Sequence, residues 1–248
     1  MSRIHDAAAV GFARGAEAYE LGRPGYPAEA LEALRLSPDL TVLDLAAGTG
    51  KLTRPLAASG ARVIAVEPVA EMRAALPPSV EALDGTAESI PLGDGSVDLV
   101  TVAQAFHWFD GDAALAEIHR VLRPGGRLAL LWNRRVEDAP ANLAFDAVVE
   151  PFRRGTPTHR GEGWRAAFER TVLFGPLEEH VFATEQVFDA DGLEARVASI
   201  SFIAALPEAE RARVLAAARE LAEDGPVRVP YRTEVLVCER LDSSPGGT

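Results

Sequence analysis

A turn of small residues follows the first expected strand and is the strongest candidate for ligand binding. Residues 41–45 are apolar enough for a buried strand, residues 46–50 read Ala-Ala-Gly-Thr-Gly, and a helix is expected over residues 52–59. A backbone without bulky side chains can approach a ligand closely, and ligands of open α/β sheets bind outside the carboxyl ends of the strands. The stretch predicts a binding loop, with an ordinary glycine-rich turn as the alternative.

Three ligand chemistries compete for this loop. A phosphate-binding P-loop needs glycine where Leu45 stands and Ser or Thr where Leu52 stands, so it fails. A dinucleotide fingerprint has Thr53 at its third glycine and leaves Asp44 unexplained. An adenosine cofactor without a diphosphate explains Asp44, because S-adenosylmethionine carries an ammonium and a sulfonium that favour a nearby carboxylate. The residues therefore favour S-adenosylmethionine, which methyl transfer converts into S-adenosylhomocysteine.

A second acidic residue ends the next expected strand. Glu67 follows residues 61–66, where a carboxylate can accept hydrogen bonds from both ribose hydroxyls. A solvated glutamate that caps the next helix is the alternative. Met72 lies further on and either packs on the adenine face or is a plain core methionine.

These residues resemble motif I of class I S-adenosylmethionine-dependent methyltransferases, written D/E-x-G-x-G-x-G. This chain has Asp44, Gly48 and Gly50, with Ala46 where the first glycine usually stands. The resemblance implies that Asp44 and the loop, Thr49 included, line the methionine part of the cofactor.

Later segments are similar to further motifs of the same family. Glu67 and Pro68 match its acid-proline pair, and residues 84–92 resemble its third cofactor segment, commonly G-D-A-E-x-L-P. The resemblance implies that the Thr86 hydroxyl accepts from the adenine amino group and that the backbone of Ala87 completes the contact.

Residues 104–110, Gln-Ala-Phe-His-Trp-Phe-Asp, stand where the family's fourth motif faces the transferred methyl group. They resemble the type 11, small-molecule branch, which includes trans-aconitate methyltransferase-like proteins. The resemblance implies cofactor contacts for Gln104, Phe106 and Trp108. Two roles are open for His107: a general base for the acceptor, or a contact that holds the loop and the cofactor. The adjacent aromatic residues favour the contact.

The N-terminal segment is also similar to that branch, in which N-terminal helices close over the cofactor. Tyr19 precedes Gly-Arg-Pro-Gly-Tyr-Pro at residues 22–27. Tyr19 and Arg23 would then meet the cofactor carboxylate, since an arginine fork suits a carboxylate. A surface turn is the alternative.

The segments that must position these residues alternate between apolar runs typical of buried strands and stretches with a helical pattern. Apolar strands are expected over residues 41–45, 61–66, 96–102 and 127–132, and helices over residues 52–59, 71–76 and 111–122. This alternation predicts an α/β, Rossmann-like doubly wound fold with a mostly parallel seven-stranded sheet, helices on both faces and a helical cap.

The regions outside this core divide the chain. A helix is expected over residues 28–36, mostly helical structure over 136–175, strands over 178–188 and 227–240, and a helix over 207–223. The predicted organisation is an N-terminal helical cap segment (1–38), a cofactor-binding core (39–135), a helical substrate region with one core strand (136–225), a final core strand (226–242) and a flexible tail (243–248).

Composition limits the partners. The chain of 248 residues has 25 Lys and Arg against 37 Asp and Glu, a net charge of −12, which argues against nucleic acid or an anionic membrane surface. Its single cysteine and five scattered histidines predict neither a disulfide framework nor a metal site. No segment suggests a signal peptide or a membrane span, which predicts a cytoplasmic protein.

Taken together, the residues predict an enzyme that transfers a methyl group from S-adenosylmethionine to a small-molecule acceptor. Two alternatives stay open: an enzyme of the same fold that uses the cofactor in a non-methylating reaction such as cyclisation, and a non-catalytic regulator that retains the cofactor pocket. The residues specify neither the acceptor nor an oligomeric state.

Overall fold

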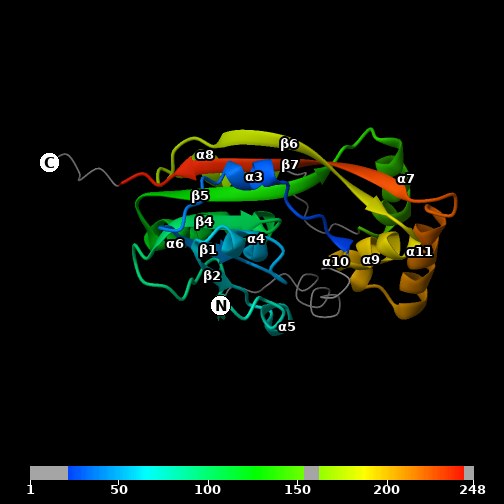
Figure 1. Cartoon of the computed structure of the whole chain (residues 1–248), viewed down its shortest axis with the longest axis horizontal. Helices are drawn as coiled ribbons and strands as arrows, with labels where there is room; N and C mark the ends of the chain where they lie inside the picture. The colour runs from blue at the N-terminus through cyan, green and yellow to red at the C-terminus, as the bar shows by residue number, and fades with distance from the viewer. Residues whose placement is uncertain (1–21, 154–161, 243–248) are drawn as a thin grey trace.

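A computed structural model of the chain describes residues 22–153 and 162–242. These residues form a seven-stranded sheet in the order β3-β2-β1-β4-β5-β7-β6 (Figure 1). The strands are β1 (Thr41–Leu45), β2 (Arg62–Val66), β3 (Glu81–Leu83), β4 (Val97–Ala103), β5 (Leu122–Arg135), β6 (Glu178–Phe188) and β7 (Val227–Glu239). The predicted fold class is confirmed.

Most of the sheet is parallel. The pairs β1–β2, β1–β4, β2–β3 and β4–β5 are parallel, and β7 lies antiparallel between β5 and β6. The carboxyl ends of β1, β2, β4 and β5 therefore lie along one edge of the sheet, which is where ligands of such sheets bind.

Helices cover the sheet and extend it. The α-helices are α3 (Ala28–Glu32), α4 (Thr53–Ala58), α5 (Ala70–Arg73), α6 (Gly111–Val121), α7 (Pro140–Val149), α8 (Arg165–Arg170), α9 (Ala190–Ala198), α10 (Ser201–Ala204) and α11 (Glu208–Glu220). Three 3₁₀ turns are η1 (Phe106–Trp108), η2 (Glu150–Phe152) and η3 (Glu162–Trp164).

Alternation along β1 explains why both faces of the sheet are covered. Leu43 and Leu45 belong to a cluster with the apolar face of α6, whereas Val42 points to the other face, with buried residues of α3 and α4. Successive strand residues face opposite sides, so a strand buried on both sides reads as a continuous apolar run. Asp110 caps α6 by accepting from the Ala113 N–H.

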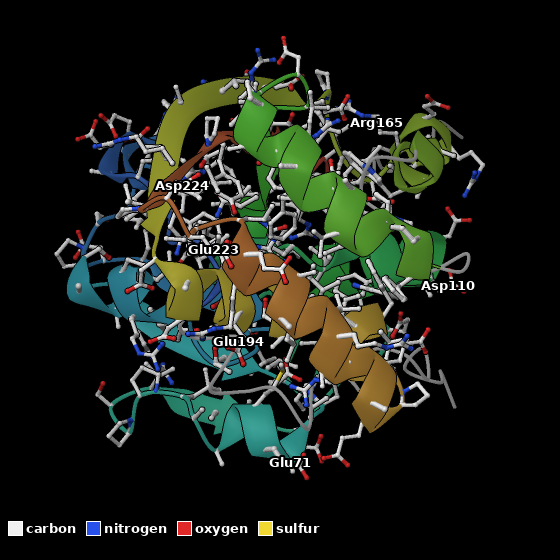
Figure 2. The ribbon with its side chains drawn as sticks, turned by 90° about the vertical axis from the view of Figure 1, so that its right-hand side faces the viewer. Glu71, Asp110, Arg165, Glu194, Glu223 and Asp224 are labelled. Atoms are coloured by element: carbon white, nitrogen blue, oxygen red, sulfur yellow. The ribbon has the colours of Figure 1, made fainter. Side chains whose placement is uncertain are left out.

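A third cluster of buried side chains holds the cap together. It joins Phe145 of α7, Leu193 of α9, Val214 of α11 and Tyr231 of β7. In Figure 1 these helices gather at one end of the sheet. Figure 2 looks onto that end, where Glu194 of α9 and Glu223, just after α11, are labelled.

The structure differs from the expectations in a few places. The position of the edge strand β3 was not expected, whereas α9 and α10 lie inside the region 136–225 that was expected to be helical, although no separate helix was assigned there. The helix expected over residues 28–36 ends at Glu32, because the chain turns and Arg35 takes a φ of 50°. β5 begins at Leu122, well before the expected residue 127, with an irregular register against β4.

Some predictions fall on segments outside the described residues. These are the N-terminal part of the cap segment with Tyr19, residues 154–161, and the tail at residues 243–248.

Candidate functional site

The loop after β1 has an unusual backbone. Ala46 and Gly48 both have a φ of 58°, and Gly50 has a φ of 91°. A positive φ is costly for a residue with a Cβ atom, and such residues concentrate at functional sites. A Cβ atom added to Gly48 would meet no atom of the described residues within 4 Å, so those residues leave space beside this part of the loop.

Asp44 lies beneath the loop and fastens it. Its carboxylate accepts from the hydroxyl of Thr53 at 2.6 Å and from that of Thr101 at 3.1 Å, which ties β1 to the start of α4 and to β4. The residue is 1% exposed, and burial raises its pKa to about 6 against the lowering effect of the two hydroxyls. Thr53, which stands where the dinucleotide fingerprint requires glycine, is thus a hydrogen-bond donor to Asp44.

Glu67 connects the end of β2 to the same loop. One carboxylate oxygen accepts from the Gly48 N–H at 2.8 Å, and the other accepts from the Val69 N–H at 2.9 Å. The side chain is almost fully buried, and this desolvation raises its pKa. An ionised carboxylate has about four acceptor positions, so two remain for further donors such as ribose hydroxyls.

The predicted adenine residues lie beyond Glu67. Met72 is buried on α5, and Ala87 is buried in a tight turn in which Thr86 and Ser89 exchange backbone hydrogen bonds of 3.3 and 3.2 Å. Pro68 is half-buried between Glu67 and α5. The positions of these residues fit a cofactor edge, while the burial of Met72 also fits a plain core role.

The end of β4 supplies the next part of the site. Gln104 has a φ of 59°, and its N–H donates to the Leu131 carbonyl at 2.8 Å. The side chain of Phe106 turns inward: it is 1% exposed and packs against Phe109, Trp164 and Phe168. Phe106 therefore supports the loop from the core.

His107 and Trp108 follow Phe106 in η1, with ring centroids 5.1 Å apart. Burial first, and the charge of Arg23 second, lower the pKa of His107 to about 4. The imidazole is therefore neutral near pH 7, with one nitrogen able to accept a hydrogen bond.

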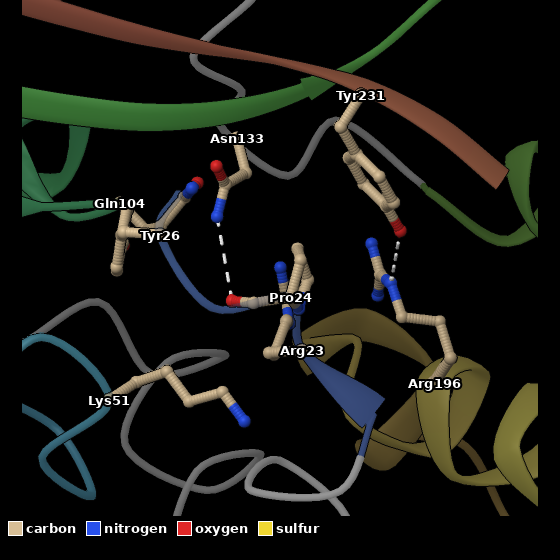
Figure 3. A pocket seen from close by; sticks show the side chains of 8 residues that line it. All are labelled: Arg23, Pro24, Tyr26, Lys51, Gln104, Asn133, Arg196 and Tyr231. Atoms are coloured by element: carbon tan, nitrogen blue, oxygen red, sulfur yellow. Dashed lines mark hydrogen bonds between the residues drawn. The ribbon is translucent and has the colours of Figure 1, made fainter. Parts of the chain in front are cut away.

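A recess of about 320 Å³, open solvent included, lies beside these residues (Figure 3). Its lining comes from six different parts of the chain: Arg23, Pro24, Tyr26, Lys51, Gln104, Asn133, Arg196 and Tyr231. In Figure 3, Arg196 and Tyr231 lie together on one side, Gln104 and Lys51 on the other, and Arg23 between them.

Hydrogen bonds of Asn133 and Arg23 hold the N-terminal turn against the recess. Asn133 donates to the carbonyls of Gly25 at 3.0 Å and Pro24 at 3.4 Å, and accepts from the Thr233 hydroxyl at 2.6 Å. Arg23 donates to the Ser199 carbonyl at 3.2 Å. A Cβ atom at Gly22 would lie 2.5 Å from the Cα of Arg196, so only glycine fits there.

The sequence interpretation missed four lining residues: Lys51, Asn133, Arg196 and Tyr231. Lys51 entered only as part of a P-loop that failed. Asn133 carried a usable signal, because it directly follows an expected strand whose end faces the site. Arg196 and Tyr231 carried no such signal, since an arginine in a helix and a tyrosine in a strand are common and indicate no binding site by themselves.

Two further observations limit the site. Within residues 22–153 and 162–242, no helix has the length and apolarity needed to cross a bilayer. The same residues bring together no group of three or more His, Cys, Asp or Glu side chains that would hold a metal ion.

Comparison with known proteins gives the family. A methyltransferase domain model matches residues 43–130. An uncharacterised methyltransferase of Mycobacterium tuberculosis is 40% identical over 245 residues, which cover 93% of this chain and 95% of the relative. A demethylmenaquinone methyltransferase of Mycolicibacterium vanbaalenii is 44% identical over 123 residues, or 49% of this chain and 52% of the relative.

A solved structure from Anaeromyxobacter dehalogenans that carries the name type II methyltransferase has a TM-score of 0.66 and 26% identity, covering 87% of this chain and 97% of its own. The strand order, the loop after β1 and these relatives agree, and the chain belongs to the family of S-adenosylmethionine-dependent methyltransferases.

Proposed function

We propose that the chain binds S-adenosylmethionine along the edge formed by residues 46–50, Glu67 and the end of β4, and transfers its methyl group to a small-molecule acceptor. The observation that carries the proposal is the hydrogen bond from the Gly48 N–H to Glu67, because it links the residue predicted to bind the ribose to the loop predicted to bind the methionine part of the cofactor.

The residues present fit this cofactor. The space next to Gly48 is open to a ligand, and Glu67 keeps acceptor positions for two ribose hydroxyls. Arg23 lies at the recess, where its guanidinium suits the cofactor carboxylate. Asp44, with both oxygens on hydroxyls, acts through the loop that it fastens.

S-Adenosylmethionine, when bound, would supply an activated methyl group, because that carbon is attached to a positively charged sulfur that is a good leaving group. Such a donor is already activated, so positioning of the acceptor supplies most of the acceleration, about 7–11 kcal/mol in favourable cases. The low pKa of His107 supports the contact role, because an efficient general base has a pKa near the working pH.

A small acceptor fits the charge of the chain, because the net charge of −12 disfavours nucleic acid. One relative that matches 49% of this chain is named demethylmenaquinone methyltransferase, and a quinone acceptor of that kind is neither a protein nor a nucleic acid.

Calorimetry with S-adenosylmethionine, S-adenosylhomocysteine and NAD tests the binding step. We expect the first two to bind in the micromolar range, about −8 kcal/mol; heat with NAD alone would overturn the proposal. Mass analysis of turnover mixtures then separates a methylated acceptor from a cofactor fragment, which would indicate cyclisation. Cofactor binding without turnover on any acceptor would instead indicate a regulator.

A further inference from the structure

Arg196 is a buried cation that forms no ion pair with any described residue. The residue is 7% exposed, at the last turn of α9. Its guanidinium makes two long hydrogen bonds of 3.4 Å, to the hydroxyls of Tyr231 and Ser199, and lies 5.3 Å from the Phe145 ring centroid. A guanidinium has five N–H donors and stays charged, so these contacts use a minority of its donors.

A neighbouring arginine shows what a paired cation looks like in this cap. Arg135 lies over the same Phe145 ring, at 4.2 Å, and its side chain is 9% exposed. Its guanidinium forms an ion pair with the Asp146 carboxylate. Buried charges are normally paired in this way, because desolvation is costly. Arg196 therefore departs from the pattern that Arg135 follows on the same ring.

The position of Arg196 at the end of α9 does not account for it. A cation near a helix C-terminus is stabilised by the helix dipole, but that effect is small and is obtained at the surface as well. It supplies no reason to bury the guanidinium or to aim it into a recess. The side chain lines the recess together with the Tyr231 hydroxyl (Figure 3).

The charge of the recess exceeds what the cofactor requires. Among its described lining residues are three cations, Arg23, Lys51 and Arg196, and no acidic residue. S-Adenosylmethionine carries one carboxylate against an ammonium and a sulfonium, so its own net charge is positive. Its single carboxylate is matched by Arg23 under the proposed function, which leaves Arg196, on the Tyr231 side of the recess, for another anionic group.

We propose that Arg196, assisted by the Tyr231 hydroxyl, binds an oxyanion of the methyl acceptor, so that the acceptor is an anionic small molecule. The inference rests on the proposed function, since it names the substrate class of that site. A carboxylate and a phosphate share the required chemistry: both accept two parallel hydrogen bonds from a guanidinium fork.

Calorimetry on the full chain tests this with succinate, inorganic phosphate and neutral succinamide, each with and without saturating S-adenosylhomocysteine. The variants are R196Q and the control R219Q, which removes an exposed cation of α11 that pairs with Asp191 and Glu194 of α9, the helix that carries Arg196. We expect wild type and R219Q to bind succinate or phosphate but not succinamide, and R196Q to bind the anion at least tenfold more weakly. Tighter binding of succinate would indicate that the acceptor carries a carboxylate, and tighter binding of phosphate would indicate that it carries a phosphate group.

Affinity for S-adenosylhomocysteine separates this proposal from the proposed function. It should change less than twofold in R196Q. An equal loss of S-adenosylhomocysteine and anion affinity would assign Arg196 to the cofactor carboxylate and overturn the inference. Absence of anion binding by wild type, or unchanged anion binding by R196Q, would also overturn it. If wild type binds no S-adenosylhomocysteine at all, the proposed function itself fails.

The melting temperature shows whether R196Q loses anion binding only because the variant is less stable. An uncompensated buried cation is a liability without its anion, so R196Q should melt at or above the wild-type temperature, whereas R135Q should melt lower because Asp146 loses its partner. The anion should raise the melting temperature of wild type but not that of R196Q. A lowered melting temperature in R196Q, with an undiminished shift on adding anion, would indicate a structural role only.

Discussion

The carboxylate of Glu67 accepts a hydrogen bond from the backbone N–H of Gly48 at 2.8 Å, so the acid that ends β2 also fixes the loop that follows β1. A second bond, from the Val69 N–H, orients the same carboxylate from the other side. A change at Glu67 should therefore affect both the loop and the ribose contact.

Replacement of Glu67 by alanine should weaken S-adenosylhomocysteine binding by about 1–3 kcal/mol, the usual range for lost charged hydrogen bonds. The free energy of unfolding should fall as well, because two backbone N–H groups lose their acceptor. Calorimetry and denaturant unfolding measure the two effects. Glu71→Ala, at an exposed position on α5, is the control and should change neither. Normal affinity in a destabilised Glu67→Ala protein would remove Glu67 from the cofactor site.

Replacement of Gly48 by valine should abolish detectable cofactor binding. The added side chain meets no atom of the described residues near its Cβ, so it projects into the space that the ligand would occupy. The φ of 58° adds a cost of about 1–2 kcal/mol for any residue with a Cβ atom. Gly48→Ala also places a Cβ atom at this φ but adds less bulk and no β-branch, and the free energy of unfolding of each variant measures its backbone strain separately from the loss of binding. Equal affinities for valine and alanine would contradict the proposed position of the ligand.

The parts of the site that the sequence predicts are those in which one short segment carries the whole signal. Gly48 and Glu67 closely follow the buried strands β1 and β2, whose mostly apolar sequences are what a sheet buried on both faces requires. The edge strand β3 has no such run, because two of its residues are exposed. Arg196 and Tyr231 reach the recess only through tertiary packing of the cap, which no local pattern encodes.

Asn133 shows the same limit within the sheet. Its amide holds the N-terminal turn through Gly25 and is itself oriented by Thr233, which the antiparallel pairing of β5 with β7 places directly opposite. Neither partner is near Asn133 in the sequence, so the contact could not be read from spacing.

Asp44 should make the chain less stable as the pH rises. Its pKa is about 6 in the folded protein, above the ordinary value of 3.8, so between pH 4 and 6 the folded state binds more protons than the unfolded state. The free energy of unfolding therefore falls through this window, by about 3 kcal/mol from this group. Urea unfolding of wild type and Asp44→Asn at several pH values checks this: the wild-type value minus the variant value should decline between pH 4 and 6. A flat difference would contradict it.

Loss of the Asn133 amide should loosen the N-terminal turn. In Asn133→Ala the Gly25 carbonyl loses its donor and the Thr233 hydroxyl loses its acceptor. Hydrogen exchange of residues 22–27 should then be about tenfold faster, which corresponds to about 1.4 kcal/mol. In wild type, cofactor and acceptor together should slow exchange in this segment if it closes over the site. Unchanged exchange in the loaded wild type would argue against a lid.

His107 should act as a contact rather than a base. His107→Gln keeps a polar side chain of similar reach, so under the contact role cofactor affinity falls while turnover at saturating cofactor and acceptor survives. A general base would instead show normal cofactor affinity and a loss of about 10²–10⁴ in turnover. The rate profile of such a base would fall on acidification near pH 4, where the imidazole of His107 titrates.

The pH dependence of stability tests His107 independently, and the expected change is opposite in direction to that of Asp44. Because the pKa of His107 is lowered from 6.5, its contribution is present above pH 6.5 and is lost as the pH falls towards 4. The wild-type free energy of unfolding minus that of His107→Gln should therefore decline on acidification, and a difference that stays constant from pH 7 to 4 would show that the imidazole is not buried as a neutral group.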